Sequence, residues 1–274
     1  MDFKVGNIVS RISHNHDIIF KIIAIDGFNC LLQGVDIRLC ADADMNDLVS
    51  IKDDINNEKD EEIIKRNLKE FDFDRDNYFY IPGNILHIDG DDDYLDRCMK
   101  FYKELGIKAN GISINEHLIS SKIVSLIKEY RPDILVITGH DAYYSKKNNI
   151  HDIRNYQNTK NFVAAIKEAR KIEKNQDKLI IIAGACQSNY EELIKAGANF
   201  ASSPKRINIH ALDPAIIASS LAFSDKNKEI DLISIIKKTK YGSDGIGGII
   251  TNGTMYVGFP RWIFLLQKYL LKTN

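Results

Sequence analysis

The chain of 274 residues is long enough for one or two domains with a buried core. Its 37 Lys and Arg nearly balance 38 Asp and Glu, and a net charge of −1 gives no electrostatic sign of nucleic-acid binding. No apolar run is long enough to cross a bilayer, and the first residues lack the build of a secretory signal. The composition favours a cytoplasmic protein without nucleic-acid or membrane partners.

Short strands are expected in the first fifty residues. Turn signals such as Asp26-Gly27 separate apolar stretches at residues 7–13, 17–24, 30–33, 36–40 and 47–51. Strands this short and closely spaced predict a small SH3-like β-barrel at residues 1–52. The charged residues 53–76 that follow are interpreted as a solvated helix or a linker between domains.

Strands and helices alternate from residue 84 onward. We expect strands at 85–88, 109–114, 134–137 and 179–183, and helices at 94–105, 118–130 and 159–173. Apolar runs without alternation, such as Ile134–Ile137, are typical of parallel strands that helices cover on both faces. Residues 77–274 are therefore predicted to form a doubly wound α/β domain with a mainly parallel sheet.

The C-terminal part carries weaker signals. Further helices are expected at 215–223 and 230–238, and an amphipathic helix at 262–271. Asn252-Gly253 separates two β-rich stretches and is a strong signal for a hairpin turn.

Polar residues follow two of the predicted strands, Thr138–Asp141 after one and Gly184–Cys186 after the next. Because ligands bind beyond the carboxyl ends of the strands in open α/β sheets, we expect His140 and Cys186 on one rim. An imidazole can take the proton of a thiol, and the resulting thiolate is a nucleophile. The pattern predicts a cysteine peptidase with Cys186 as nucleophile and His140 as general acid and base, without a metal or an organic cofactor.

The tetrahedral intermediate of such a reaction needs backbone N–H donors for its oxyanion. Gly139 and Gly184 allow tight turns that aim amides at a substrate. We expect the donors to be the amide of Cys186 and the amides from Gly139 to Asp141.

The order of the two residues resembles that of a known group of enzymes. His140 precedes Cys186 by roughly the interval of about 50 residues found in caspases, and Ala185-Cys186-Gln187 matches the centre of their cysteine motif. The sequence thus resembles the caspase–gingipain–legumain group of cysteine peptidases. In that group a Gly usually follows the catalytic His, whereas here Gly139 precedes it, which leaves the oxyanion donor open.

The likeness narrows to one family. The sequence resembles the YabG sporulation-specific peptidases of spore-forming bacteria at residues 3–13, 88–94, 131–144, 183–188, 196–206 and 207–214. The resemblance implies a caspase-like fold, with Cys186 as the nucleophile and His140 as its partner. It also implies processing of spore coat and related proteins after Arg, on the mother-cell side of the sporulating cell or at the spore coat.

Preference for Arg implies a carboxylate in the pocket, because a planar guanidinium pairs best with one. Asp141 and Asp213 are the two candidates. An enzyme with this preference is also expected to cut itself in the charged linker, at Lys65-Arg66 or at Arg75.

Other interpretations of these residues stand beside the catalytic one. A cysteine after an apolar strand is often only a packed thiol, and Cys30, Cys40 and Cys98 are read as buried filler. His210 is the rival base, and His87 is most simply a hydrogen-bonded core residue. The acidic run Asp89–Asp93 is compatible with Mg²⁺, but an acidic helix N-terminus has the same composition.

Two functions of other classes also remain. A flavodoxin-like or receiver-like signalling module is suggested by acidic residues after the first strand and Pro132-Asp133 before the third, although Thr138 stands where the phospho-acceptor Asp should be. A non-catalytic coat or scaffold protein that uses its barrel for assembly is the third interpretation.

Overall fold

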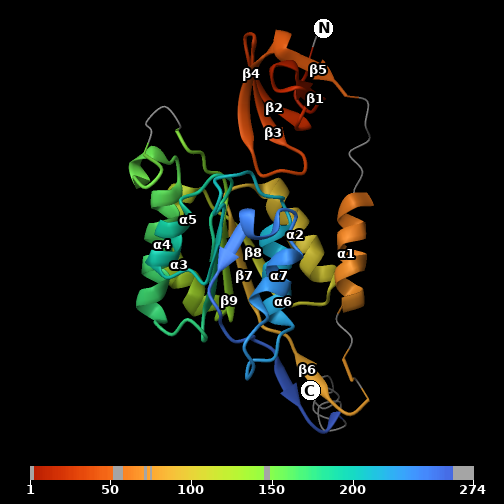
Figure 1. The fold of residues 1–274 in the computed structure, drawn as a ribbon, viewed down its shortest axis with the longest axis vertical. Helices are drawn as coiled ribbons and strands as arrows, with labels where there is room; N and C mark the ends of the chain where they lie inside the picture. The colour runs from red at the N-terminus through yellow and green to blue at the C-terminus, as the bar shows by residue number, and fades with distance from the viewer. Residues whose placement is uncertain (1–2, 52–57, 71–72, 75, 145–148, 262–274) are drawn as a thin grey trace.

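The computed structural model describes residues 3–51, 58–70, 73–74, 76–144 and 149–261. Within these residues a five-stranded antiparallel sheet near the N-terminus is separate from a six-stranded, mainly parallel sheet (Figure 1). A third pairing joins β6 (Phe79–Ile81) to β13 (Tyr256–Gly258). The α/β prediction is confirmed, whereas the helix predicted at 262–271 lies outside the described residues.

The five-stranded sheet, called the N-terminal sheet from here on, has the order β4-β3-β2-β1-β5. Its core is apolar and includes the fully buried Phe20, Ile22 and Leu32. The strands are β1 (Ile8–Arg11), β2 (Phe20–Asp26), β3 (Asn29–Gly34), β4 (Cys40–Asp44) and β5 (Leu48–Ser50).

The prediction of a strand at 36–40 is wrong for residues 36–39. β4 begins only at Cys40, and residues 35–39 leave the N-terminal sheet before it. The backbone of this segment pairs with another part of the chain instead, since Ile37 forms an antiparallel bridge with His210. Residues 35–39 are called the inserted segment below.

The charged stretch after the N-terminal sheet contains a helix, α1 (Glu58–Glu70). Ile64 of this helix is buried in the core of the larger part. Asp60 accepts two hydrogen bonds from Arg97 of the larger part, from Nε at 2.8 Å and from Nη2 at 2.9 Å. Of the two interpretations of this stretch, the helix holds for residues 58–70. One face of it is packed through Asp60, Ile64 and Asn67, and most of its other described side chains are exposed.

The six-stranded sheet, called the main sheet, has the order β12-β11-β10-β9-β7-β8. Its strands are β7 (Ile85–Asp89), β8 (Ala109–Ser113), β9 (Ile134–Thr138), β10 (Ile180–Ala183), β11 (Phe200–Ser202) and the antiparallel edge strand β12 (Ile246–Gly248). The strand order reverses between β7 and β9, which makes this pair the topological switch point where open α/β sheets bind ligands.

Helices cover both faces of the main sheet, as its apolar strands require. They are α2 (Asp92–Glu104), α3 (Glu116–Tyr130), α4 (Thr159–Ile172), α5 (Tyr190–Ala196), α6 (Asp213–Ala222) and α7 (Leu232–Lys237). One buried cluster joins the sheet to α3, α4 and α5, and another joins the opposite face to α1, α2, α6 and α7. Turns of 3-10 helix lie at Ile12–His14, Met45–Asp47, Ile153–Asn155 and Gly242–Asp244.

The predicted hairpin at Asn252-Gly253 is wrong. β12 pairs with β11 and β13 pairs with β6, so the two flanking stretches do not pair with each other. The turn is packed against the loop after α6, where Gly253 donates its amide to Lys228 O at 3.1 Å. A Cβ at position 253 would overlap the backbone of Ser224, so close packing accounts for this glycine.

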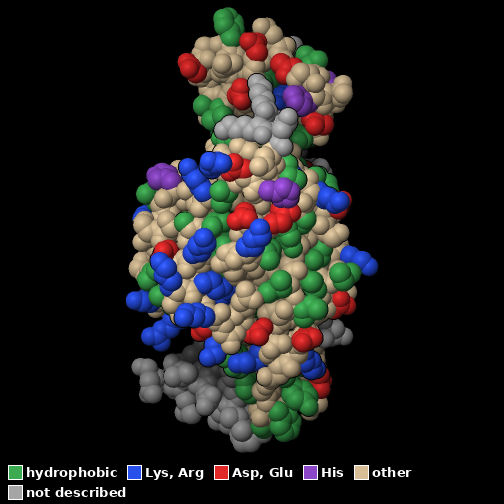
Figure 2. All heavy atoms as spheres, turned by 60° about the vertical axis from the view of Figure 1, so that its left-hand side comes forward, with side chains coloured by type: hydrophobic (Ala, Val, Ile, Leu, Met, Phe, Trp, Pro, Cys, Tyr) green, Lys and Arg blue, Asp and Glu red, His purple; other side chains and the backbone are tan. Residues whose placement is uncertain are grey.

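The two sheets meet at one end of the molecule. Figure 1 shows the N-terminal sheet at one end of the main sheet, and contacts to Asp89 and His140 identify that end as the carboxyl end of the parallel strands. Figure 2 brings the α3–α5 side forward and shows Lys and Arg gathered there. Exposed lysines of this side are Lys122, Lys128, Lys160, Lys167, Lys171 and Lys195. None of the helices in the described ranges is long and apolar enough to cross a membrane.

The buried strands predict a large cost for truncation. Ile181 is fully buried in β10, and an Ile181→Ala change should lower the free energy of unfolding by about 2–5 kcal/mol in urea titration. The control is Ile233→Ala in α7, whose side chain is 60% exposed and should change stability by about 0.5 kcal/mol or less. Equal losses in the two variants would contradict this packing.

Candidate active site

Two parallel strands deliver the predicted pair of residues to one rim. β9 and β10 are direct neighbours, and Ile137 is paired with Ala183 in their register. His140 and Cys186 each follow these paired residues at the same interval, so both lie just beyond the carboxyl ends. The predicted adjacency of the two strands is confirmed.

Cys186 is fully buried. Its Sγ accepts a hydrogen bond from the amide of Ile209 at 3.2 Å. The next residue, Gln187, has a φ of +57°, and its amide donates to Ile207 O at 3.1 Å and to Ser203 Oγ at 2.9 Å. Burial raises the pKa of the Cys186 thiol to about 12. The thiol is held in a sharp turn and is protonated at neutral pH in this conformation.

Glycines shape both strand ends. Gly184 has a φ of +106°, and a Cβ there would lie 2.7 Å from Leu193 Cδ1, so the position excludes other residues. A Cβ at Gly139 would overlap the carboxylate of Glu116, which accepts the His140 amide at 2.7 Å. Because Glu116 engages the His140 amide, the oxyanion prediction depends on other donors, foremost the amide of Cys186.

His140 is oriented by a carboxylate. Its Nε2 is 2.8 Å from Asp91 Oδ2 and 3.5 Å from Cys40 Sγ. Burial lowers the pKa of His140, but the hydrogen bonds to Asp91 and Cys40 outweigh it and raise the pKa to about 10. The other ring nitrogen, Nδ1, is buried and has no hydrogen-bond partner within the part of the chain that the structure describes.

Asp91 is a residue that the sequence interpretation missed. It caps the N-terminus of α2 by accepting the Tyr94 amide at 3.0 Å, and it accepts the side-chain amide of Gln33 from the N-terminal sheet. Burial raises the pKa of Asp91, and the hydrogen bond with His140 more than compensates, so the pKa lies below its ordinary value. The acidic run was noted in the sequence, but only its helix-start interpretation was favoured, and that interpretation agrees with this cap.

His140 and Cys186 share a rim without touching through a hydrogen bond. Among the described residues, the hydrogen bonds of the His140 ring go to Asp91 and Cys40, and those of the Cys186 thiol go to Ile209. Cys40 is half-buried and begins β4. Its interpretation as buried filler is therefore wrong, because its thiol lies against the histidine.

A second buried feature lies at the switch point. Arg38 of the inserted segment is fully buried, and its Nη1 is 2.7 Å from Asp89 Oδ2 at the end of β7. Its Nε donates to Ala211 O at 3.1 Å, and its guanidinium lies 5.0 Å from the centre of the Tyr94 ring. Thr138 at the end of β9 donates its hydroxyl to Asp89 at 2.7 Å. These groups form a pocket that holds one arginine side chain.

Charge balance in this pocket favours the ionised pair. Burial raises the pKa of Asp89, but the Arg38 guanidinium and the hydrogen bonds from His87 and Thr138 hold it well below its usual range. The nearby Asp89 carboxylate raises the pKa of Arg38 against the effect of burial. Sequence reasoning missed this pair, since Arg38 stood in an expected strand and Asp89 was considered only as part of the acidic run Asp89–Asp93.

The two acids predicted to read Arg lie elsewhere and have internal partners. Asp141 accepts from the amides of Ala142 and Asn158 and from the hydroxyls of Ser188 and Thr159. Asp213 begins α6 and accepts from the amides of His210 and Lys240, each at 2.9 Å. Burial raises the pKa of Asp141 and raises that of Asp213 to about 6.

The remaining histidines and cysteines have structural partners. His210 Nδ1 accepts the Leu212 amide at 3.2 Å, and burial lowers its pKa to about 4. His87 is fully buried between Tyr102 and Thr138, each at 3.0 Å, as expected of a core histidine. Cys30 and Cys98 are buried as predicted, although the Cys98 thiol also lies 3.7 Å from Arg38 Nη2.

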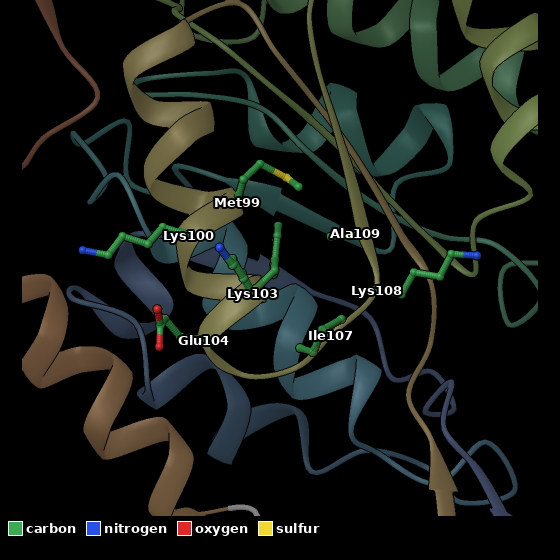
Figure 3. A pocket seen from close by; sticks show the side chains of 8 residues that line it. Met99, Lys100, Lys103, Glu104, Ile107, Lys108 and Ala109 are labelled. Carbon is green, nitrogen blue, oxygen red and sulfur yellow. The ribbon is translucent and has the colours of Figure 1, made fainter. Parts of the chain in front are cut away.

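Metal-ligating clusters and open pockets are the other features that could bind a ligand. In the described ranges, no group of three or more His, Cys, Asp and Glu side chains is arranged to hold a metal ion. An open pocket of about 730 Å³ lies between the end of α2 and the start of β8 (Figure 3). Because Lys108 and Ala109 precede or begin a parallel strand, this pocket is at the amino edge of the sheet, away from Cys186.

Comparison with known proteins assigns the family. The sequence model described as YabG peptidase U57 matches residues 4–260, a range that includes His140, Cys186 and the Arg38 pocket. This chain belongs to the YabG peptidase family. The sporulation-specific protease YabG of Bacillus subtilis (strain 168) is 40% identical over 292 aligned positions, which cover 95% of this chain and 99% of that protein. The chain is therefore a peptide hydrolase of the YabG family.

The Asp91 contact predicts how His140 titrates. In Asp91→Asn the pKa of His140 should fall below its wild-type value of about 10, because the carboxylate no longer stabilises the imidazolium while burial still opposes it. The measurement is an NMR titration of the ring in a Cys186→Ala background. Asn is also a good N-cap, so α2 should remain intact.

The same contact has a pH-dependent effect on stability. The raised pKa means that the stabilisation by His140 is complete below pH 6.5 and is lost as pH rises through about 10. Wild type should therefore lose its stability advantage over Asp91→Asn across that window, whereas the exposed Asp92→Asn control should track wild type. An unshifted His140 pKa in Asp91→Asn would refute the assignment.

Proposed function

We propose that this protein is a cysteine endopeptidase in which Cys186 is the nucleophile and His140 the general acid and base. The observation that carries the proposal is the delivery of both residues to one rim by adjacent strands, β9 and β10. Asp91 supports it as a positioning residue, because it engages His140 Nε2 and leaves Nδ1 for proton transfer.

The proposed reaction proceeds in two steps. The reactive form is the neutral imidazole, whose Nε2–H donates to Asp91 and whose Nδ1 takes the thiol proton. The Cys186 thiolate then attacks the scissile carbonyl carbon, whose oxyanion is stabilised by backbone amides that include that of Cys186. The imidazolium then protonates the departing amine as the C–N bond breaks. Water, deprotonated by His140, hydrolyses the resulting thioester and releases the acid product.

The proposal includes cleavage after Arg. The pocket at the switch point supports it, because a buried carboxylate, a carbonyl oxygen and an aromatic ring already surround the guanidinium of Arg38. Asp89 is therefore favoured as the residue that reads Arg, because its carboxylate already pairs with a guanidinium, whereas the donors to Asp141 and Asp213 are backbone amides and hydroxyls.

The proposal also covers the domain architecture and the biological role. Parallel strands in the order β8-β7-β9-β10-β11 with an antiparallel edge strand support a caspase-like domain at 77–274, and five short antiparallel strands support an SH3-like barrel at 1–52 with a connector at 53–76. The name of the Bacillus subtilis relative supports a role in sporulation. Spore coat and related proteins are the proposed substrates, on the mother-cell side or at the coat.

Self-cleavage in the connector is also proposed. Lys65 and Arg66 lie within α1, so cutting there requires that the helix unwinds first. Arg75 lies outside the described residues.

The signalling alternative has one supporting feature, since receivers share the strand order seen here. However, Thr138 occupies the end of β9, and its hydroxyl donates to Asp89. With no acceptor carboxylate at that position, peptide hydrolysis remains the better proposal.

The test compares cleavage of a fluorogenic peptide that ends in Arg. Cys186→Ala and His140→Ala should each lower kcat/KM by about a thousandfold or more, because each removes a group that takes part in the chemical step. Cys30→Ala, in the core of the N-terminal sheet, is the matched cysteine control and should retain activity. Matching Lys and Gln peptides should be cut poorly, and full turnover by Cys186→Ala would rule out the proposed nucleophile.

A further inference from the structure

The inserted segment pairs with the main part of the molecule as an extended strand. The Arg38 amide donates to Ile209 O at 3.1 Å, and the Ala211 amide donates to Asp36 O at 3.0 Å. Together with the bridge between Ile37 and His210, these bonds form a short antiparallel ladder. Addition of an extended strand to an exposed backbone edge is a common way for proteins to hold peptides.

The ladder lies directly against the proposed nucleophile. The same Ile209 that pairs with Arg38 donates its amide to Cys186 Sγ at 3.2 Å. Ile37 forms one buried apolar cluster with Cys186 and Ile209, and Leu39 packs against that cluster. The residues on both sides of Arg38 therefore contribute to the complete burial of the thiol, which leaves no room for another peptide.

The residue after the segment covers the proposed base. Cys40 Sγ lies 3.5 Å from His140 Nε2, beside the bond to Asp91. Tyr94 also anchors the segment, because its hydroxyl lies 2.6 Å from Gly34 O and 2.8 Å from Ile37 O and shares its one proton between them. Residues 34–40 thus occupy the pocket, the strand-pairing edge and the space beside both catalytic groups at once.

We propose that the inserted segment is a built-in substrate mimic, with Arg38 in the pocket that receives the Arg of a substrate, and that it keeps the enzyme latent until the N-terminal sheet moves away. This inference rests on the proposed function. It accounts for an arginine buried completely at a ligand-binding switch point. It also agrees with a thiol that burial keeps protonated in this conformation.

A purely structural role for Arg38 makes the opposite prediction. If the ion pair with Asp89 only holds two parts of the chain together, its removal lowers stability and activity. If the segment blocks the cleft, its weakening exposes Cys186 and raises activity. The two roles are therefore separable by experiment.

The test uses the full chain with Arg38→Ala and Arg38→Lys. The Lys variant keeps a cation opposite Asp89 but loses the planar guanidinium. Because the buried carboxylate still has a partner, this variant should fold even if the Ala variant does not. Arg11→Ala is the matched control, because Arg11 belongs to the N-terminal sheet and lies over Phe20 rather than in the cleft. Circular dichroism and thermal melting establish that each variant is folded.

The first measurement is the rate at which iodoacetamide alkylates Cys186, read by peptide mass spectrometry, which separates it from Cys40. Opening of the segment sets the accessible population, so the rate should rise by about tenfold or more in Arg38→Ala and less in Arg38→Lys. The second measurement is cleavage of the Arg peptide, which should rise in the same order. Arg11→Ala should match wild type in both.

Failure of the two proposals is distinguishable. Alkylation reports access to the thiol whether or not Cys186 is catalytic, while residual activity of Cys186→Ala reports on the mechanism alone. If the Arg38 variants are folded but are alkylated and cleave no faster than wild type, the proposal that the inserted segment keeps the enzyme latent is wrong. The proposed catalytic mechanism would be unaffected by that result.

Discussion

The ion pair between Arg38 and Asp89 is the interaction on which the arrangement of the two sheets depends. Both side chains are fully buried, and their nearest atoms are 2.7 Å apart. Removal of one partner from such a pair generally costs about 3–5 kcal/mol, because the other charge stays desolvated. A segment from the N-terminal sheet must therefore remain at the carboxyl edge of the main sheet for as long as the carboxylate has no other cation.

Much of the fold is predictable from local pattern. The apolar strands at 134–137 and 179–183 and the α-helix between them follow from periodicity, and the adjacency of β9 and β10 follows from that single crossover helix. That adjacency was enough to bring His140 and Cys186 to one rim. The hairpin at Asn252-Gly253 failed because a local turn signal cannot report that tertiary partners capture the two flanking stretches.

The site residues that the sequence did not predict depend on contacts between residues that are distant in the chain. Asp36–Cys40 has the composition of a strand, and nothing local distinguishes a paired strand from a segment that leaves its sheet. Asp91 is equally ambiguous, because a helix cap and a partner for His140 require the same residue type. Arg38 and Asp89 become meaningful only when the two sheets are placed together.

Arg97 gives the molecule a mechanical linkage. This one guanidinium on α2 holds Asp60 of α1 at 2.8 Å, lies 3.8 Å from Asp36 and donates to Val35 O. The charged connector and the inserted segment thus both bind the same Arg97 side chain. A cut that releases α1 would remove a carboxylate from Arg97 and weaken its contacts with Val35 and Asp36, so a change in α1 would reach the inserted segment through Arg97.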